Sequence, residues 1–217
     1  MAKLYQSNKD ESARLFKSDF LEMFTHVHWS VPIIIYLPVV TYFVWLGIQD
    51  GLLGAGSMTG LFTVGVFVWT LTEYTLHRFV FHYQPKSSWG QKLNFLMHGV
   101  HHDYPNDTKR LVMPPSVSIP LAALFGGLFY VLLGPVMMKP FLAGFLFGYI
   151  LYDEIHYATH HAPVKAGFFQ KIKHHHVLHH YKDPERGFGV SSPLWDHVFG
   201  TYYRVEEQPL PVEPAKQ

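Results

Sequence analysis

Histidine is the residue type most suited to chemistry in this chain: sixteen of the 217 residues are histidine, and most of them are grouped. The segment KHHHVLHH, residues 173–180, holds five, away from the ends of the chain, where purification tags sit. Three further groups read HRFVFH, HGVHH and HYATHH. Imidazole suits zinc, copper, iron and nickel, and a chain without cysteine has no thiolate to offer. The pattern therefore predicts metal chemistry based on ring nitrogens.

Helical spacing would bring several of these histidines onto common faces. On an α-helix, residues i, i+3 and i+4 share one side. The motif H-x-x-H-H occurs twice, at residues 98–102 and 176–180, and His156 and His160 are spaced i, i+4. Each set can therefore converge on one side of its own helix.

His77 and His82 do not fit this spacing, because five residues on an ideal helix turn two side chains about 140° apart. Either the helix ends or bends there, or the two rings point to different metals. Ten converging imidazoles exceed the roughly four to six ligands that one ion takes. Two ions with about five histidines each are the economical arrangement.

The elements that must position these rings look like membrane helices. Charged residues make up 15% of the chain, against about 25% in a soluble domain. Residues 23–49, 51–72 and 111–138 lack Asp, Glu, Lys and Arg, and a spanning helix needs about 20 apolar residues. A fourth run, 141–152, is long enough only if its polar end projects beyond the lipid. The length of these runs disfavours a soluble helical protein.

Two short connections, QDGLLGAGS and GPVMMKP, predict that these runs form two hairpins. Sixteen of the seventeen Lys and Arg residues then fall on one side, and Lys139 alone falls on the other. The positive-inside rule places that side in the cytosol, with both termini. The histidines lie there too. We predict an all-α integral membrane protein: four transmembrane helices in two hairpins, with a cytosolic helical cap that holds a histidine-rich dimetal site.

The chain divides into three parts on this prediction. Residues 1–28 form a cytosolic or interfacial segment without the apolar core of a signal peptide. Within it, residues 15–27 are either an amphipathic interfacial helix or a plain linker. Residues 29–204 form the membrane-embedded domain with its cap, and we expect the Pro- and Glu-rich residues 205–217 to be disordered. The bacterial inner membrane or the endoplasmic reticulum would suit this topology. A net charge of +1 indicates no nucleic-acid partner.

The order H-x(4)-H, H-x-x-H-H, H-x(3)-H and H-x-x-H-H, each near a cytosolic helix end, resembles the fatty acid hydroxylase superfamily. These are membrane oxygenases with a histidine-rich dimetal site. The segments EYTLHRFVFH, HGVHHDYPNDTKRLVMPP and HHYKDPERGFGVSSPLWDHVFGT resemble the fatty acid 2-hydroxylases, or sphingolipid alpha-hydroxylases. The likeness covers about residues 69–201. It implies a monooxygenase that inserts one O₂-derived oxygen at carbon 2 of a long-chain fatty acid or of a sphingolipid N-acyl chain.

The resemblance also implies the metal site. It gives ten ligands: His77, His82, His98, His101, His102, His156, His160, His176, His179 and His180. His174, His175 and His161 match no required position. The reaction needs a redox metal, and zinc has no redox chemistry, so we expect two iron ions. Zinc could nevertheless occupy the site after purification.

Electrons are a separate requirement of this reaction. The eukaryotic relatives carry a cytochrome b5 domain with a His-Pro-Gly-Gly haem motif, which this sequence lacks. We therefore expect a separate electron-transfer protein, such as cytochrome b5 or a ferredoxin, as a partner beside the lipid or fatty acyl substrate.

Polar residues near the histidines are candidates for supporting roles. Glu73 and Asp153 lie one turn before a histidine, so either could orient a metal-bound ring; ordinary ion pairing is the alternative. Asp103, Asp183 and Asp196 are weaker candidates. Five residues could bind the substrate head group: Tyr104, Arg110, Tyr152, Tyr181 and Arg186. Either arginine could instead contact lipid phosphate.

Three other functions compete with this prediction. A sterol- or carotenoid-modifying di-iron oxygenase has the same histidine pattern. A metal transporter would place its ligands near the bilayer midplane, whereas these histidines crowd one end of the predicted spans. A zinc hydrolase would have little use for ten histidines.

Overall fold

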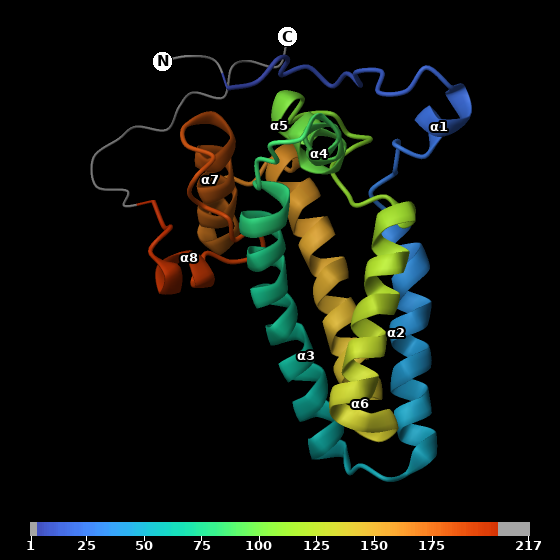
Figure 1. Ribbon diagram of the computed structural model, residues 1–217. Helices are drawn as coiled ribbons and strands as arrows, with labels where there is room; N and C mark the ends of the chain where they lie inside the picture. Colours follow the sequence, from blue (N-terminus) through green and yellow to red (C-terminus); the bar gives the residue numbers. More distant parts are fainter. Residues whose placement is uncertain (1–3, 204–217) are drawn as a thin grey trace.

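A computed structural model describes residues 4–203 of the chain, and every regular element in that range is a helix. Figure 1 shows an elongated bundle with a cap of shorter helices over one end. In chain order the elements are α1 (Asp19–Met23), α2 (Val31–Asp50), α3 (Ala55–Leu76), η1 (His77–Phe81), α4 (Ser88–Asn94), η2 (Phe95–Gly99), α5 (Val100–Asp103), α6 (Pro115–His161), α7 (Gly167–Tyr181) and α8 (Leu194–Phe199). The two η elements are π-helical turns.

Three helices in the described range are long and apolar enough to cross a membrane: Val31–Asp50, Ala55–Phe81 and Pro115–His161. Their outer faces carry large apolar side chains with nothing packed on them; Val131, for example, is 80% exposed. Such faces suit lipid. The all-helical fold is thus confirmed, with three helices that could span a membrane, whereas the expected count of four separate spans is not.

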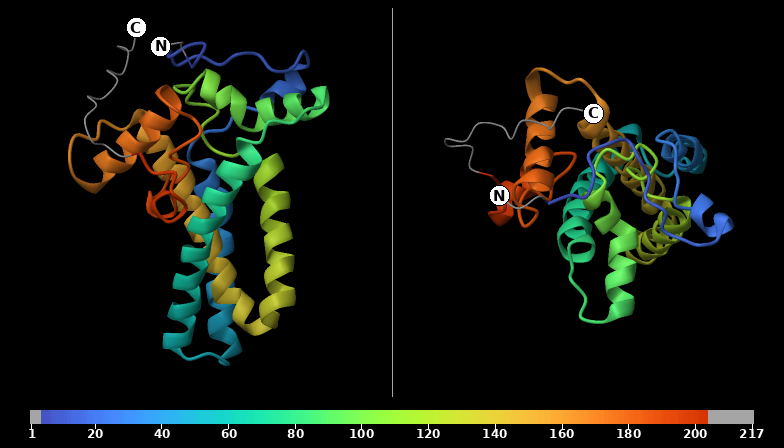
Figure 2. Two further views of the ribbon diagram at one scale, coloured as in Figure 1. Left: turned by 60° about the vertical axis from the view of Figure 1, so that its left-hand side comes forward. Right: turned by 90° about the horizontal axis from the view of Figure 1, so that it is seen from above.

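The third of these helices, α6, reverses direction part-way along. Gly134 has φ 71° and ψ 173°, which interrupts the helix, and Figures 1 and 2 show two limbs running side by side. The ring of Phe129 on the first limb packs on Phe141 and Phe145 on the second. The reversal falls within the expected connection GPVMMKP, but the connection is shorter than the seven residues expected. Only Gly134 breaks the helix, because Pro135 fits the first turn of the next limb.

Helix α3 packs closely on the second limb of α6. A side chain on Gly144 would place its Cβ 1.9 Å from the carbonyl oxygen of Phe62, and one on Gly65 would lie 2.1 Å from that of Phe141. Small residues that allow backbones to approach are typical of packing between membrane helices. This contact holds the helix ends that carry His77 and His156 in a fixed relation.

The segment before α2 is mostly not helical. Only residues 19–23 form a helix, so an amphipathic helix over 15–27 is wrong and the linker alternative is closer. The carboxylate of Glu22 accepts hydrogen bonds from the amides of Leu15 and Phe16 at 3.0 and 2.7 Å, which satisfies these groups without a helix. The expected disordered tail, 205–217, lies outside the described residues, and the boundaries at 28 and 204 stay predictions.

Candidate metal centre

Ten histidines from four parts of the chain meet where the bundle joins the cap. They come from the end of α3 with η1, from η2 with α5, from the last turns of α6, and from α7. Two groups of five form there, and within each group the candidate ligand nitrogens all lie within 4.8 Å of one another. The first histidine group is His77, His82, His98, His102 and His179; the second histidine group is His101, His156, His160, His176 and His180.

In both groups the Nε2 atoms point at one another. In the first, Nε2 of His98 lies 3.1 Å from Nε2 of His77 and 3.0 Å from Nε2 of His102. In the second, Nε2 of His176 lies 2.9 Å from that of His160 and 3.1 Å from that of His180. Each contact between two nitrogens needs one proton to be a hydrogen bond, and one N–H can donate to only one of them. Each group therefore has more inward-facing lone pairs than protons.

The divergent pair His77 and His82 belongs to one group. The helix widens to a π-turn at this point, and the amide of His82 donates to the carbonyl of His77 at 3.1 Å. In a π-turn residues i and i+5 lie one above the other, so both rings face the same side. Of the two alternatives left open by the sequence, the change in the helix is the one found. π-Turns inside α-helices are frequent at functional sites.

Each H-x-x-H-H motif contributes to both groups. His98 and His102 belong to the first and His101 to the second, while His179 belongs to the first and His176 and His180 to the second. The rings of His102 and His180 stack at 4.3 Å where the groups meet. The repeated motif thus builds two adjoining sites, rather than one site per helix.

Backbone carbonyls orient three of the rings. Nδ1 of His77 donates to the carbonyl of Phe188 at 2.6 Å, Nδ1 of His179 to that of Arg186 at 2.6 Å, and Nδ1 of His156 to that of Leu111 at 3.0 Å. A carbonyl only accepts, so the proton is on Nδ1 and the Nε2 lone pair faces inward. Unshared lone pairs about 3 Å apart repel unless a cation lies between them. The donor set therefore fits a metal ion in each group.

Burial keeps these rings neutral and ready to bind a cation. It lowers the pKa of His82 to about 2 and that of His102 to about 3, with neighbouring histidines adding to the effect. Burial and neighbouring histidines also lower the pKa of His98, His179 and His180 well below the ordinary value of 6.5.

We predict that acid removes bound metal and destabilises the protein. Burial lowers the pKa values of these rings below the ordinary 6.5 in the folded protein. Below pH 6.5 the unfolded chain therefore binds more protons than the folded protein. The stability that the neutral rings contribute is present above pH 6.5 and is lost as pH falls. Protons also compete with metal for the same nitrogens. Metal analysis after equilibration across this range is expected to find full retention at pH 8 and progressive loss below about pH 6. Retention down to pH 4 would contradict buried imidazole ligation.

A cavity of about 560 Å³ leads to the two groups. Its walls are mostly apolar and come from the N-terminal segment, α4, η2 and the start of α6, and His98, His101 and His156 lie on its lining. Both histidine groups therefore border one apolar space, which has the size of a small-molecule site.

Comparison with known proteins agrees with this geometry. The model of the fatty acid hydroxylase family matches residues 62–201, which include all ten histidines. This chain belongs to the fatty acid hydroxylase family.

Several relatives of this hydroxylase family member align along most of its length. It is 43% identical over 193 residues to a dihydroceramide fatty acyl 2-hydroxylase of Arabidopsis thaliana, covering 88% of this chain and 80% of that protein. It is 45% identical over 194 residues to the ceramide very long chain fatty acid hydroxylase of Saccharomyces cerevisiae, covering 88% of this chain and 50% of that protein. The fatty acid 2-hydroxylase of Rattus norvegicus is 39% identical over 217 residues, covering 90% and 58%. The chain thus spans about half the length of the yeast and rat relatives.

A solved structure has the same fold. It is that of full-length Scs7p, in which only the hydroxylase domain is visible. The TM-score is 0.82 at 44% sequence identity, and the match covers 88% of this chain and 72% of that one.

Among the candidate substrate residues of this family member, Tyr152 and Arg110 line the cavity. Tyr152 stacks against His156, with ring centroids 5.9 Å apart. Tyr104, Tyr181 and Arg186 are not on the cavity lining: Tyr181 donates to the side chain of Asn8 at 2.5 Å, and Arg186 pairs with Asp183 at 3.6 Å. A role for these three in binding substrate stays a prediction.

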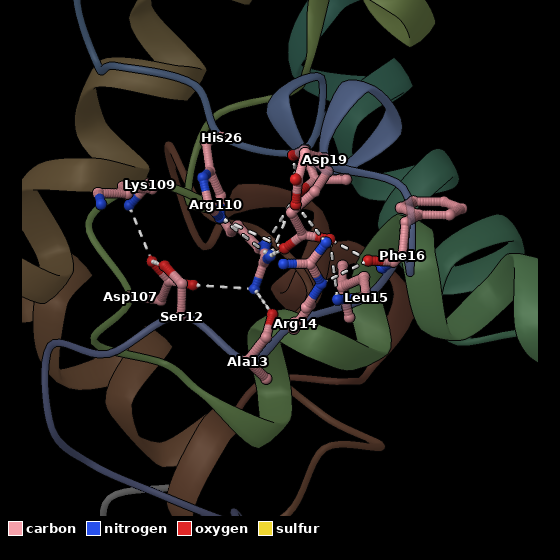
Figure 3. A network of polar contacts seen from close by, with 12 residues as sticks. Ser12, Ala13, Arg14, Leu15, Phe16, Asp19, His26, Asp107, Lys109 and Arg110 are labelled. Atoms are coloured by element: carbon pink, nitrogen blue, oxygen red, sulfur yellow. Dashed lines mark hydrogen bonds and ion pairs between the residues drawn. The ribbon is translucent and has the colours of Figure 1, made fainter.

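Arg110 is committed to contacts within the protein. Its guanidinium donates to Glu22 at 2.6 Å and to the carbonyl of Ala13 at 2.5 Å, and it lies 3.4 Å from Asp107. Figure 3 shows how this buried side chain ties the N-terminal segment to the cap. That segment contributes Leu15, Phe16, Leu21 and Phe24 to the cavity lining. Arg110 therefore holds one wall of the cavity in place.

The two carboxylates proposed from the sequence are buried beside the site, yet among the described residues they make no hydrogen bond to the ten rings. Glu73 accepts from the amide and hydroxyl of Ser191 at 2.9 and 2.7 Å. Asp153 lies on the cavity lining. Roles for them at the metals stay predictions. The carbonyls that do orient the rings could not be found from side-chain types.

The remaining histidines lie outside both groups. His26 contacts Arg110, His28 contacts Ser30, and His197 stacks on Tyr202. His175, by contrast, is buried and bonded to Asp196 at 3.0 Å. That contact was missed from the sequence, although Asp196 stands in a segment that resembles the 2-hydroxylases.

Proposed function

We propose that this chain is a membrane monooxygenase that inserts one O₂-derived oxygen at carbon 2 of a long-chain fatty acid or of a sphingolipid N-acyl chain. The observation that carries the proposal is the apolar cavity that ends on both histidine groups. An acyl chain fits apolar walls, and the reacting carbon must lie beside the metals. The names of the plant, yeast and rat relatives, all acyl or ceramide hydroxylases, support the same substrate class.

We propose the ten grouped histidines as the ligands of two iron ions. Iron bound there would supply the activation of O₂ that insertion of oxygen into the C–H bond at carbon 2 requires. Zinc has no redox chemistry and cannot do this. A redox protein such as cytochrome b5 or a ferredoxin would deliver the two electrons.

The chain's own residues bind and place the substrate on this account. The apolar lining excludes water from the acyl chain. Tyr152 is the best-placed candidate to contact the carbonyl, because it lies on the lining and against His156. A carbonyl held at that point leaves carbon 2 next to the histidine groups.

We further propose four membrane crossings: α2, α3 and the two limbs of α6, with the cap and both termini in the cytosol. The break at Gly134 supports the division of α6. The positions of the Lys and Arg residues support the orientation. A metal transporter gains no support, since the histidine groups lie at the end of the bundle and not within it.

Lipid mass spectrometry tests the function. The chain is expressed in a host that lacks 2-hydroxylated acyl chains, alongside the empty vector. Acyl species with one added oxygen at carbon 2 are expected only with the protein. A hydroxylated sterol or carotenoid in their place would reject the acyl substrate and retain the oxygenase chemistry.

We predict that filling the cavity narrows the range of acyl chains accepted. Val117 lies on the lining of the first limb of α6. Val117→Trp is expected to lower kcat/KM for long chains by at least about tenfold, with short chains little affected, since each excluded methylene is worth about 1–3 kcal/mol. Val131→Trp is the matched control, because Val131 lies on the same limb and is 80% exposed. Equal losses for short and long chains would contradict the placement of the acyl chain.

A further inference from the structure

Residues 186–201 fold around one buried carboxylate, that of Asp196 on α8, which is 0% exposed. It accepts hydrogen bonds from the amides of Phe188 and Gly189 at 2.9 and 2.8 Å, from the hydroxyl of Thr201 at 2.7 Å and from Nε2 of His175 at 3.0 Å. A Cβ on Gly189 would lie 2.8 Å from this carboxylate. The turn at residues 186–190 is thus shaped by its contacts with Asp196.

The same turn supports the first histidine group. The carbonyls that accept from His77 and His179 belong to Phe188 and Arg186. The ring of Phe188 also packs against the rings of His77, His82 and His179, with centroids 5.8, 5.4 and 5.7 Å apart. Three of the five rings in this group therefore depend on where the turn lies.

The second histidine group is supported from elsewhere. Its ring His156 donates to the carbonyl of Leu111, just before α6. Within the described part of the chain, no hydrogen bond or ring contact joins this group to residues 186–201. The carbonyls that orient the rings of the two groups therefore come from different parts of the chain, although both groups have ligands on α7.

His175 connects the turn to the ligand helix. It precedes His176 on α7, but it faces the other way: its ring stacks on Tyr202 at 5.0 Å and its Nε2 donates to Asp196. One face of α7 thus carries ligands of both groups, and the other is fastened to Asp196.

We propose that Asp196 is a positioning residue for the first histidine group, acting through the carbonyls of Phe188 and Arg186, and that the second group does not depend on it. The inference rests on the proposed dimetal function. Asp196→Asn would replace one acceptor oxygen with an NH₂ donor that faces an existing donor. The turn must then shift, and the rings of His77 and His179 lose their orientation. Loss of such an outer partner costs about 10–100-fold in metal affinity.

Metal counting tests this without relying on activity. Purified protein is stripped, titrated with zinc as a redox-silent probe, and analysed for bound metal at low free zinc. The wild-type chain is expected to hold two ions and Asp196→Asn one, with the lost ion rebound only at about 10–100-fold higher free zinc. Two ions in the variant at low zinc, or none, would overturn the role of Asp196. Fewer than two ions in the wild type would instead overturn the dimetal proposal.

Double variants identify the ion that is lost. Asp196→Asn with His77→Ala is expected still to hold one ion, because both changes affect the first group. Asp196→Asn with His160→Ala is expected to hold none. The reverse pattern would contradict the assignment.

A second pair of variants covers the case in which Asp196→Asn does not fold. His175→Gln retains a side-chain N–H donor for Asp196, whereas His175→Leu does not. His175→Gln is expected to hold two ions and His175→Leu to bind the first-group ion more weakly. Equal binding by the two variants would overturn the proposed support.

Discussion

Replacing His179 by alanine is expected to abolish the hydroxylated acyl product. Nε2 of His179 lies 3.1 Å from that of His82 within the first histidine group, and the ring is fully buried. Loss of a group that only hydrogen-bonds to a metal-bound histidine lowers metal affinity or activity about 10–100-fold. Removal of a ligand itself should therefore lower activity at least about 100-fold. Product formation is measured by mass spectrometry in membranes with equal amounts of protein.

His174→Ala is the matched control for this prediction. His174 lies on the same helix, α7, but outside both histidine groups. Activity within about twofold of the wild type is expected for it, since substitutions away from special features change little. If His179→Ala retained activity, or if His174→Ala lost it equally, the division of the KHHHVLHH segment into ligand and other histidines would be wrong.

Gly144→Ala is expected to cause the largest loss of stability among single changes in the bundle. The added Cβ would lie 1.9 Å from the carbonyl oxygen of Phe62, so α3 and α6 must separate. Overpacking of this kind costs about 3 kcal/mol when backbone has to move. We expect a clearly lower Tm in detergent and less folded protein in the membrane, measured by thermal unfolding followed through size-exclusion chromatography.

Gly127→Ala provides the control, because nothing lies within 4 Å of its Cβ position on the other limb of α6. This variant should equal the wild type or exceed it slightly, since alanine favours helix over glycine by about 1 kcal/mol. An equal Tm for the two variants would show that the close contact between α3 and α6 does not bear on stability.

The sequence predicted the grouping of the histidines better than the framework that surrounds them. The number of histidines and their spacing along the chain carry most of the information about the site. Two sets of five histidines could therefore be expected, and the structure has two such groups. The assignment of His101 to the second group and of His98 and His102 to the first could not be foreseen. Residues i, i+3 and i+4 share a helix face, but their side chains differ enough in direction to reach two neighbouring sites.

Backbone effects account for what the sequence missed. The π-turn at His77 and the reversal at Gly134 are local changes of dihedral angle that apolar periodicity does not register. The carbonyls of Leu111, Phe188 and Arg186 orient rings regardless of their own side chains. The N-terminal segment had a helical pattern of apolar residues, yet contacts with Arg110 and the cavity determine its path.

Labelling with ¹⁸O₂ tests the central claim most directly. Membranes that contain the protein and an electron donor are supplied with a long-chain acyl substrate under ¹⁸O₂, and in parallel under ordinary O₂ in H₂¹⁸O. The account predicts one ¹⁸O at carbon 2 of the acyl chain in the first experiment and none in the second. Label that came from water, or label at another carbon, would contradict a monooxygenase that acts at carbon 2 beside the two histidine groups.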